Sequence, residues 1–119
     1  MVTVTKIFTF DSAHWLPKYK GKCKNTHGHT YKLEVEVEGD IIARGESCEG
    51  MVIDFAELKG IVNREIIDKL DHINLNTIFP VPTAEIMTLE IFKKLKALVN
   101  ISRIRLWETP TSYAEVKSK

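Results

Sequence analysis

A strict alternation of side chains from residue 27 to residue 38 constrains the fold of this chain most. In HGHTYKLEVEVE one parity carries imidazole, aromatic and aliphatic side chains, whereas the other carries Lys32 and three glutamates. A period of two predicts a half-buried β-strand, because successive side chains of a strand point to opposite faces. The buried face of this strand would therefore begin with His27 and His29.

The segment from Val2 to His14 predicts a second strand. Its even positions share one face of an extended chain and include Val4, Phe8, Phe10, Ser12 and His14. If the two strands pair antiparallel, the end of the first lies beside the start of the second. Three of the four histidines in the chain would then meet.

Two helices and two further strands are expected downstream. Asp54 and Glu57 form a plausible capping box, and helical spacing of apolar residues predicts a helix to about Leu70. Thr83 can cap a second helix that ends near residue 100. The apolar stripe of that second helix is Met87, Ile91, Leu95 and Leu98. GMVIDF predicts a short strand before the first helix, and ISRIRLW and YAEV predict the last two strands.

This order predicts an α+β fold with an antiparallel sheet and two helices on one face. A chain of 119 residues fits one domain, so we expect residues 1–119 to form a single unit. With 17 basic and 16 acidic residues, no overall field favours nucleic acid or a membrane as partner. We expect neither an export signal nor a membrane span, and Cys23 and Cys48 are interpreted as free thiols in a cytoplasmic protein.

The converging histidines predict a metal site. A catalytic zinc takes three protein ligands and keeps one position open, and His14, His27 and His29 match that count. A lone histidine would more often be a hydrogen-bonded core residue, but three together favour a metal. Imidazole ligands suit zinc, with iron, copper or nickel as lesser alternatives.

Four other residues are candidates for acid–base chemistry or binding. Cys23 lies among four lysines, which lower the pKa of a thiol, so it could act as base or nucleophile. Asp71 beside His72 is either a helix cap or a carboxylate that orients an imidazole for proton transfer. Glu108 falls on the apolar parity of its strand and is either solvated or suited to gripping a guanine-like or pterin ring. The lysines form a solvated loop or favour a phosphorylated substrate.

With these residues in place, the chain resembles the 6-pyruvoyltetrahydropterin synthase family, and within it the 6-carboxytetrahydropterin synthase branch. The resemblance rests on FDSAHWLP, CKNTHGHTYKLEV, GMVIDFAELK, LDHINLN, PTAEIMTLEIFKKL and RLWETPTSYAEV, in the family's order. The spacing C-x3-H-G-H resembles the carboxy branch, whereas C-x5-H-G-H resembles the animal-type pyruvoyl branch. The loop around Cys48 departs from the family's D-x-x-T-G-M pattern.

The resemblance implies a role for each candidate. It implies that His14, His27 and His29 bind zinc and that Cys23 is the proton-abstracting base. It further implies that Asp71 and His72 form a relay with this thiol across a subunit boundary. Two residues would hold the pterin, namely Glu108 and Thr83.

The resemblance also implies a tunnelling fold (T-fold) whose subunits join into a barrel, usually as a homohexamer built from two trimers. The implied reaction converts 7,8-dihydroneopterin triphosphate into 6-carboxy-5,6,7,8-tetrahydropterin, acetaldehyde and triphosphate, on the route to queuosine. One alternative is a pyruvoyltetrahydropterin synthase, a lyase that only eliminates triphosphate. Another is a non-catalytic, zinc-stabilised oligomeric binding module in which Cys23 closes the fourth metal position.

Overall fold

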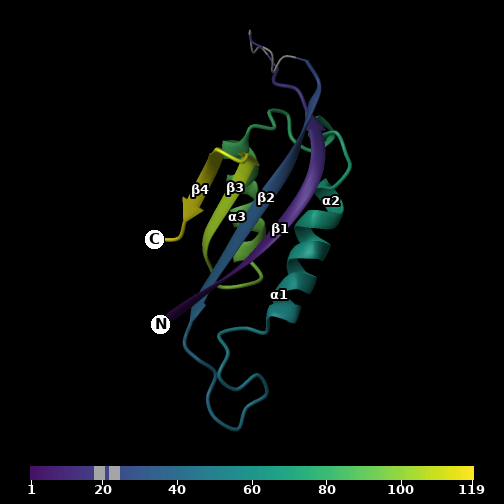
Figure 1. Cartoon of the computed structure of the whole chain (residues 1–119). Coiled ribbons are helices and arrows are strands. Elements are labelled where there is room, and N and C mark those ends of the chain that lie inside the picture. Colours follow the sequence, from purple (N-terminus) through teal and green to yellow (C-terminus); the bar gives the residue numbers. More distant parts are fainter. Residues whose placement is uncertain (18–20, 22–24) are drawn as a thin grey trace.

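The computed structural model describes residues 1–17, 21 and 25–119 and contains a four-stranded antiparallel sheet (Figure 1). The strands are adjacent in chain order, β1-β2-β3-β4. Their bounds are Val2–His14 for β1, His27–Gly39 for β2, Ile101–Thr109 for β3 and Ser112–Lys117 for β4. Their antiparallel order confirms the predicted sheet.

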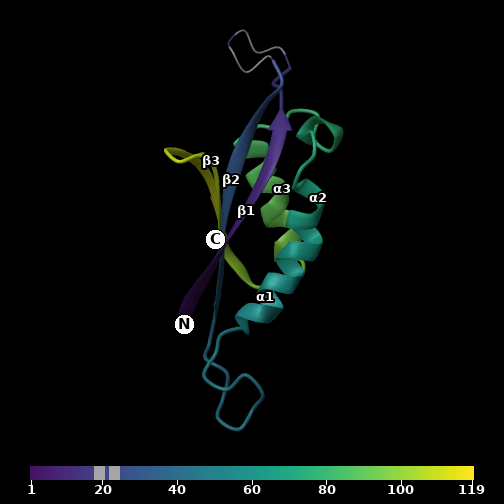
Figure 2. The ribbon, with the colours of Figure 1, turned by 45° about the vertical axis from the view of Figure 1, so that its right-hand side comes forward.

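The helices lie on one face of the sheet, and no helix or strand among the described residues covers the opposite face (Figure 2). Asp54 caps the first helix by accepting from the backbone N–H of Ala56. That helix comprises α1 (Phe55–Val62), a π-helical turn η2 (Asn63–Ile67) and α2 (Asp68–Leu70). A short 3-10 helix η3 (Leu75–Thr77) follows, and Thr83 caps α3 (Ala84–Lys96).

The core lies between this helical layer and the sheet, and the predicted parity of both long strands is confirmed. Phe8 and Phe10 of β1 and Tyr31, Leu33 and Val35 of β2 are buried on the helix-facing side. Helical residues complete the cluster, among them Leu58, Val62, Ile66, Met87, Ile91 and Leu95. Burial of these apolar side chains stabilises the sheet against the helices.

Two local predictions are wrong. The second helix ends at Lys96 rather than near residue 100, and Leu98 is 51% exposed instead of continuing the apolar stripe. The described backbone of residues 50–54 forms no strand. Its first residues instead close the preceding loop onto Ile42. The N–H of Gly50 donates to the carbonyl of Ile42, and the N–H of Ile42 donates to the carbonyl of Met51.

The molecule is elongated, 57 Å by 26 Å by 24 Å, so the sheet has two well-separated ends. At the histidine end, His14 pairs with His27. At the far end, Val2 pairs with Gly39. The residues that flank α3 contact both ends of the sheet. Pro82, just before the helix, contacts His14, and Asn100, just after it, donates to the carbonyl of Glu38.

None of the helices in the described part of the chain is long and apolar enough to cross a membrane.

Candidate metal centre

The register of β1 and β2 brings three histidines together. His14 lies opposite His27, and His29 follows two residues later on the same face. Their ring centroids are 4.6, 5.0 and 4.9 Å apart, and each pair of rings is close to perpendicular. One nitrogen from each ring lies within 4.8 Å of the others, so the cluster could hold a metal ion.

Hydrogen bonds orient two of these rings. The Nδ1–H of His14 donates to the carbonyl oxygen of Pro82 at 2.9 Å, and the Nδ1–H of His27 donates to that of Asn25 at 2.7 Å. A carbonyl oxygen only accepts, so each neutral ring keeps its proton on Nδ1 and presents a lone pair on Nε2. Metal-ligating histidines characteristically donate their second nitrogen in this way.

The resulting arrangement fits a cation. The Nε2 atoms of His14 and His27 are 3.0 Å apart, close to the spacing of about 3.3 Å that two nitrogens take around tetrahedral zinc. Two lone pairs at this distance repel each other, and a cation between them removes the repulsion. The Nε2 of His29 is buried and has no hydrogen-bond partner among the described residues. A buried nitrogen of this kind is costly unless it binds something.

Burial and neighbouring charges favour the form of His29 that can bind a metal ion. Burial lowers the pKa of His29, the carboxylate of Glu108 partly opposes this, and His14 and His27 lower it further. A lowered pKa favours the neutral imidazole, which is the form that binds metal. Tyr31 lies beneath the cluster with its hydroxyl 3.3 Å from His14 Nδ1, and burial raises its pKa, so the phenol stays protonated.

Glu108 lies beside this cluster on the same face of the sheet. Its Oε1 is 3.8 Å from Nε2 of His29. It also lines a hollow of about 620 Å³ between α3 and β4, together with Thr88, Leu89 and Tyr113. The carboxylate therefore faces both the histidines and a space large enough for a small molecule. Thr83 does not line this hollow; its hydroxyl accepts from the N–H of Ile86, which leaves the hydroxyl hydrogen free to donate.

Asp71 and His72 form a hydrogen-bonded pair on the open edge of β1. His72 Nδ1 is 2.9 Å from Oδ2 of Asp71, and Oδ1 of the same carboxylate accepts from the N–H of Asp11 at 2.9 Å. The hydrogen bond from the N–H of Asp11 lowers the pKa of Asp71 most, and the hydrogen bond from His72 lowers it further. Asp71 in turn raises the pKa of His72. The carboxylate is thereby held as the anion, which orients the imidazole and favours its protonated form.

His72 adopts an uncommon backbone conformation. Its φ is 59°, a left-handed value that costs a non-glycine residue about 1–2 kcal/mol. The N–H of His72 donates to the carbonyl of Asp11 at 2.6 Å, which helps to hold this conformation. The ring is 77% exposed, and together with His29 and Gly28 it lines a hollow of about 550 Å³.

The structure therefore brings some of the sequence candidates together and leaves others apart. The three histidines and Glu108 form one group, whereas Asp71 and His72 form another across β1. Cys23 and its neighbouring lysines 18, 20, 22 and 24 lie outside the described residues. The roles assigned to all of these residues stay predictions.

Sequence reasoning missed the residues that support the candidates, chiefly Pro82, Asp11 and Asn76. The first two act largely through main-chain groups, which any residue carries, so no side-chain pattern could signal them. Asn76 acts through its side-chain amide, which contacts the main chain of Trp15. The pattern HINLN does not by itself single out Asn76, because an asparagine after a helix is common in loops.

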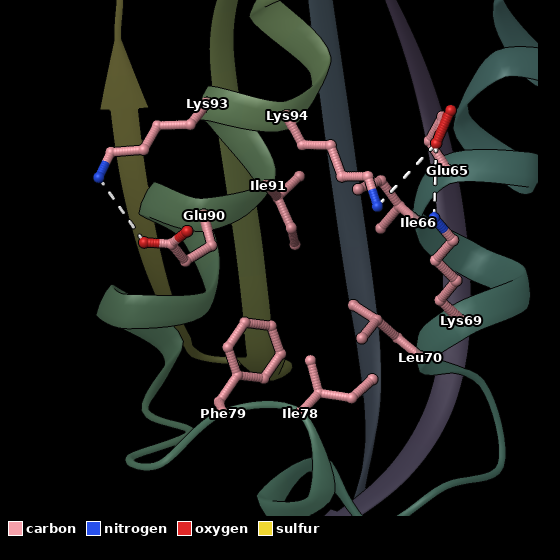
Figure 3. A pocket seen from close by; sticks show the side chains of 10 residues that line it. All are labelled: Glu65, Ile66, Lys69, Leu70, Ile78, Phe79, Glu90, Ile91, Lys93 and Lys94. Atoms are coloured by element: carbon pink, nitrogen blue, oxygen red, sulfur yellow. Dashed lines mark ion pairs between the residues drawn. The ribbon is translucent and has the colours of Figure 1, made fainter.

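A hollow of about 420 Å³ lies elsewhere, between α3 and the first helix (Figure 3). Lys94 reaches across it toward Glu65, which also lies 3.6 Å from Lys69, and Glu90 is paired with Lys93. The ten residues that line it include no histidine, cysteine or hydroxyl group. Its carboxylates are paired with lysines, so this hollow lacks the groups that make the histidine end chemically distinctive.

Comparison with known proteins agrees with the fold and the motifs. The family model described as 6-pyruvoyl tetrahydropterin synthase matches residues 3–119. The chain belongs to this family. The T-fold prediction is thereby confirmed, and a structure of the Caenorhabditis elegans 6-pyruvoyl tetrahydropterin synthase superposes with a TM-score of 0.85 at 29% identity, covering 99% of this chain and 96% of that one.

Two curated relatives carry the names of different activities. The 6-carboxy-5,6,7,8-tetrahydropterin synthase of Haemophilus influenzae is 44% identical, over 97% of this chain and 98% of its own length. The dihydroneopterin monophosphate aldolase of Pyrococcus furiosus is 39% identical, over 84% of this chain and 83% of its own length. Membership in the 6-pyruvoyl tetrahydropterin synthase family thus supports an enzyme but leaves the reaction to be argued.

Proposed function

We propose that this chain is a zinc-dependent 6-carboxytetrahydropterin synthase. It would convert 7,8-dihydroneopterin triphosphate into 6-carboxy-5,6,7,8-tetrahydropterin, acetaldehyde and triphosphate, in the queuosine route. The observation that carries the proposal is the convergence of His14, His27 and His29 with two lone pairs and one unpartnered nitrogen directed inward. The similarity to the Haemophilus influenzae enzyme and the spacing C-x3-H-G-H support this branch.

The metal site and the proton-transfer groups have separate tasks. A zinc ion held by the three histidines would supply Lewis acidity toward a substrate oxygen. Cys23 removes a proton from the substrate, a role proposed from its sequence position alone. His72 exchanges a proton with it, and Asp71 holds the imidazole in a fixed direction through the 2.9 Å bond to Nδ1.

Glu108 and Thr83 bind the substrate in this proposal. A carboxylate can accept two charge-assisted hydrogen bonds from the amino group and ring N–H of a pterin, which fixes the ring. Glu108 suits this role because it faces the hollow between α3 and β4 while lying 3.8 Å from His29. The free hydroxyl hydrogen of Thr83 supplies one further donor at the start of α3.

Assembly is part of the proposal. The chain would act as a single-domain subunit of a cytoplasmic homohexamer, made of two trimers. β4 and the part of β1 that precedes Asp11 are edges of the sheet, and exposed edges favour pairing with further strands. Joining these edges between copies would cover them and would let Cys23 of one subunit approach the Asp71–His72 pair of another.

Identifying the products tests the reaction. The purified, zinc-loaded protein is incubated with 7,8-dihydroneopterin triphosphate, and the pterin product and released aldehyde are identified by mass. Acetaldehyde together with 6-carboxytetrahydropterin supports the proposal. Triphosphate release without acetaldehyde would instead favour the pyruvoyl reaction named for the Caenorhabditis elegans neighbour.

Two cysteine variants test whether the protein is catalytic rather than a binding module. Cys23→Ser should abolish turnover and retain the metal, whereas Cys48→Ser, the matched control, should change neither. In a closed structural site the thiolate of Cys23 would itself be a ligand. Cobalt-substituted protein would then show a thiolate-to-cobalt charge-transfer band that Cys23→Ser removes, and this result would refute the catalytic role.

A further inference from the structure

The segment from Leu70 to Asn76, called here the edge segment, is hydrogen-bonded along the last residues of β1. The hydroxyl of Ser12 donates to the carbonyl of Leu70, and the N–H of Ala13 donates to the carbonyl of Ile73 at 3.0 Å. Asp11 contacts Asp71 and His72 through its N–H and its carbonyl, as described above. The edge segment therefore extends the sheet by a short parallel partner at the histidine end, with a bridge between Ala13 and Asn74.

Within the edge segment, Asn76 contacts the residue that directly follows His14. Its Oδ1 accepts from the N–H of Trp15 at 2.9 Å, and its Nδ2 donates to the carbonyl of the same residue at 3.0 Å. A primary amide presents one acceptor and one donor, so it can satisfy both main-chain groups of one residue. The two bonds fix the peptide units on both sides of Trp15, which immediately follows His14.

We propose that Asn76 is a positioning residue for the histidine cluster. It holds the main chain on the exit side of His14, so that the Nε2 of this ring stays 3.0 Å from that of His27. Through the edge segment it also keeps the Asp71–His72 pair in register with the same strand. The inference rests on the proposed metal role of the three histidines. It assigns to Asn76 a part in metal affinity that is separate from general stability.

The far end of the sheet supplies a matched control. Asn100 also uses its side-chain amide on the main chain of a strand: Nδ2 donates to the carbonyl of Glu38 at 2.7 Å, and Oδ1 accepts from Lys96 at 3.1 Å. Asn76→Ala and Asn100→Ala each remove two hydrogen bonds, but only the first change lies next to a histidine of the cluster.

The test titrates metal-free protein with Co²⁺ and follows the visible absorption of the bound ion. Asn76→Ala should lose about 10-fold or more in affinity and change the absorption spectrum, as expected for loss of a group that orients a metal ligand. Asn100→Ala should lower the melting temperature about as much as Asn76→Ala does. It should keep the wild-type affinity for Co²⁺ and the wild-type absorption spectrum. An Asn76→Ala protein with wild-type affinity and spectrum would overturn the inference. A wild-type chain that binds no Co²⁺ would overturn the proposed metal site itself.

Hydrogen exchange of the wild-type protein gives a reading that needs no variant. Coupling between two sites is reciprocal. Metal binding must therefore stabilise the two hydrogen bonds between Asn76 and the main chain of Trp15 as much as these bonds stabilise the bound metal. Exchange of the Trp15 amide should slow by about 10-fold on adding Zn²⁺. The amide of Glu38, which donates to the carbonyl of Asn100, should not respond. Equal rates at Trp15 with and without Zn²⁺ would refute the coupling even if the variants do not fold.

Discussion

The two ends of the β1–β2 pair share one alternation but use its inward positions differently. At the far end these positions carry Val4, Val35 and Val37, which join the core. At the histidine end they carry His14, His27 and His29, whose nitrogens face one another. Imidazoles at these positions bury less apolar surface than the valines at the far end do. In the proposed function, one strand pair therefore serves stability at one end and metal binding at the other.

The largest effect is expected from removing one imidazole of the cluster. His27→Ala leaves two ligands, so the dialysed protein should retain almost no zinc and its activity should fall to background. Metal content by atomic emission and turnover of the same sample check this. An active, metal-free His27→Ala protein would end the distinction between the two ends.

Removing the exposed imidazole should separate metal binding from proton transfer. His72→Ala should lower kcat by about 100-fold, the usual effect of losing a general acid or base. Zinc content should stay at the wild-type level, because His72 belongs to a separate group with Asp11 and Asp71 and not to the three-histidine cluster. A large loss of zinc in this variant would mean that the two groups are one site.

A change at the far end should show the opposite pattern. Val37 is 3% exposed and stands on the same face of β2 as His27. Val37→Ala should lower the free energy of unfolding by about 2 kcal/mol through lost burial and an unfilled cavity. Denaturant unfolding of the metal-free protein measures this cost, and metal affinity should be unchanged. His27→Ala should cost much less in the same metal-free assay.

The smallest effect is expected from neutralising the carboxylate of the Asp–His pair. Asp71 raises the pKa of His72, so Asp71→Asn should move that pKa down. Since a raised imidazole pKa stabilises the fold below that pKa and the benefit is lost as pH rises through it, the variant should lose stability on the acidic side. The alkaline limb of the pH–rate profile should move to lower pH, with about 10-fold lower kcat.

Proton NMR of the zinc-loaded protein checks the pKa change directly. Three imidazoles would be held by metal, so His72 should be the ring that titrates in the accessible range. An unchanged His72 titration in Asp71→Asn would show that the carboxylate does not control this imidazole.

Much of the fold and part of the candidate site could be predicted because they depend on local periodicity. Alternation placed Phe10 and Tyr31 on the buried face, and antiparallel pairing of neighbouring strands placed the end of the first strand, with His14, beside the start of the second, with His27. The end of the second helix was missed, since Leu98 continues the helical spacing but lies in the turn after Lys96. Spacing reports which face a residue takes only while the helix continues.

The contacts of the edge segment could not be predicted for a different reason. Asp11 and Asp71 are 60 residues apart, and Trp15 and Asn76 are 61 apart. Their bonds depend on where the first helix ends relative to the edge of β1, and no periodic pattern encodes that position. The left-handed φ of His72 belongs to the same class, because it is held by the bond from its N–H to Asp11.

Sheet order and the meeting of three histidines could be read from the sequence, because alternation and short-range pairing act between neighbouring elements. The three-dimensional structure was needed to show which imidazole nitrogens face inward, that Glu108 joins the histidines and that the Asp71–His72 pair is bonded to Asp11 of β1. The bond from His14 to Pro82, the approach of Glu108 to His29 and the bonds between Asp11 and the Asp71–His72 pair join segments that are distant in the sequence, and such contacts form only after packing brings those segments together.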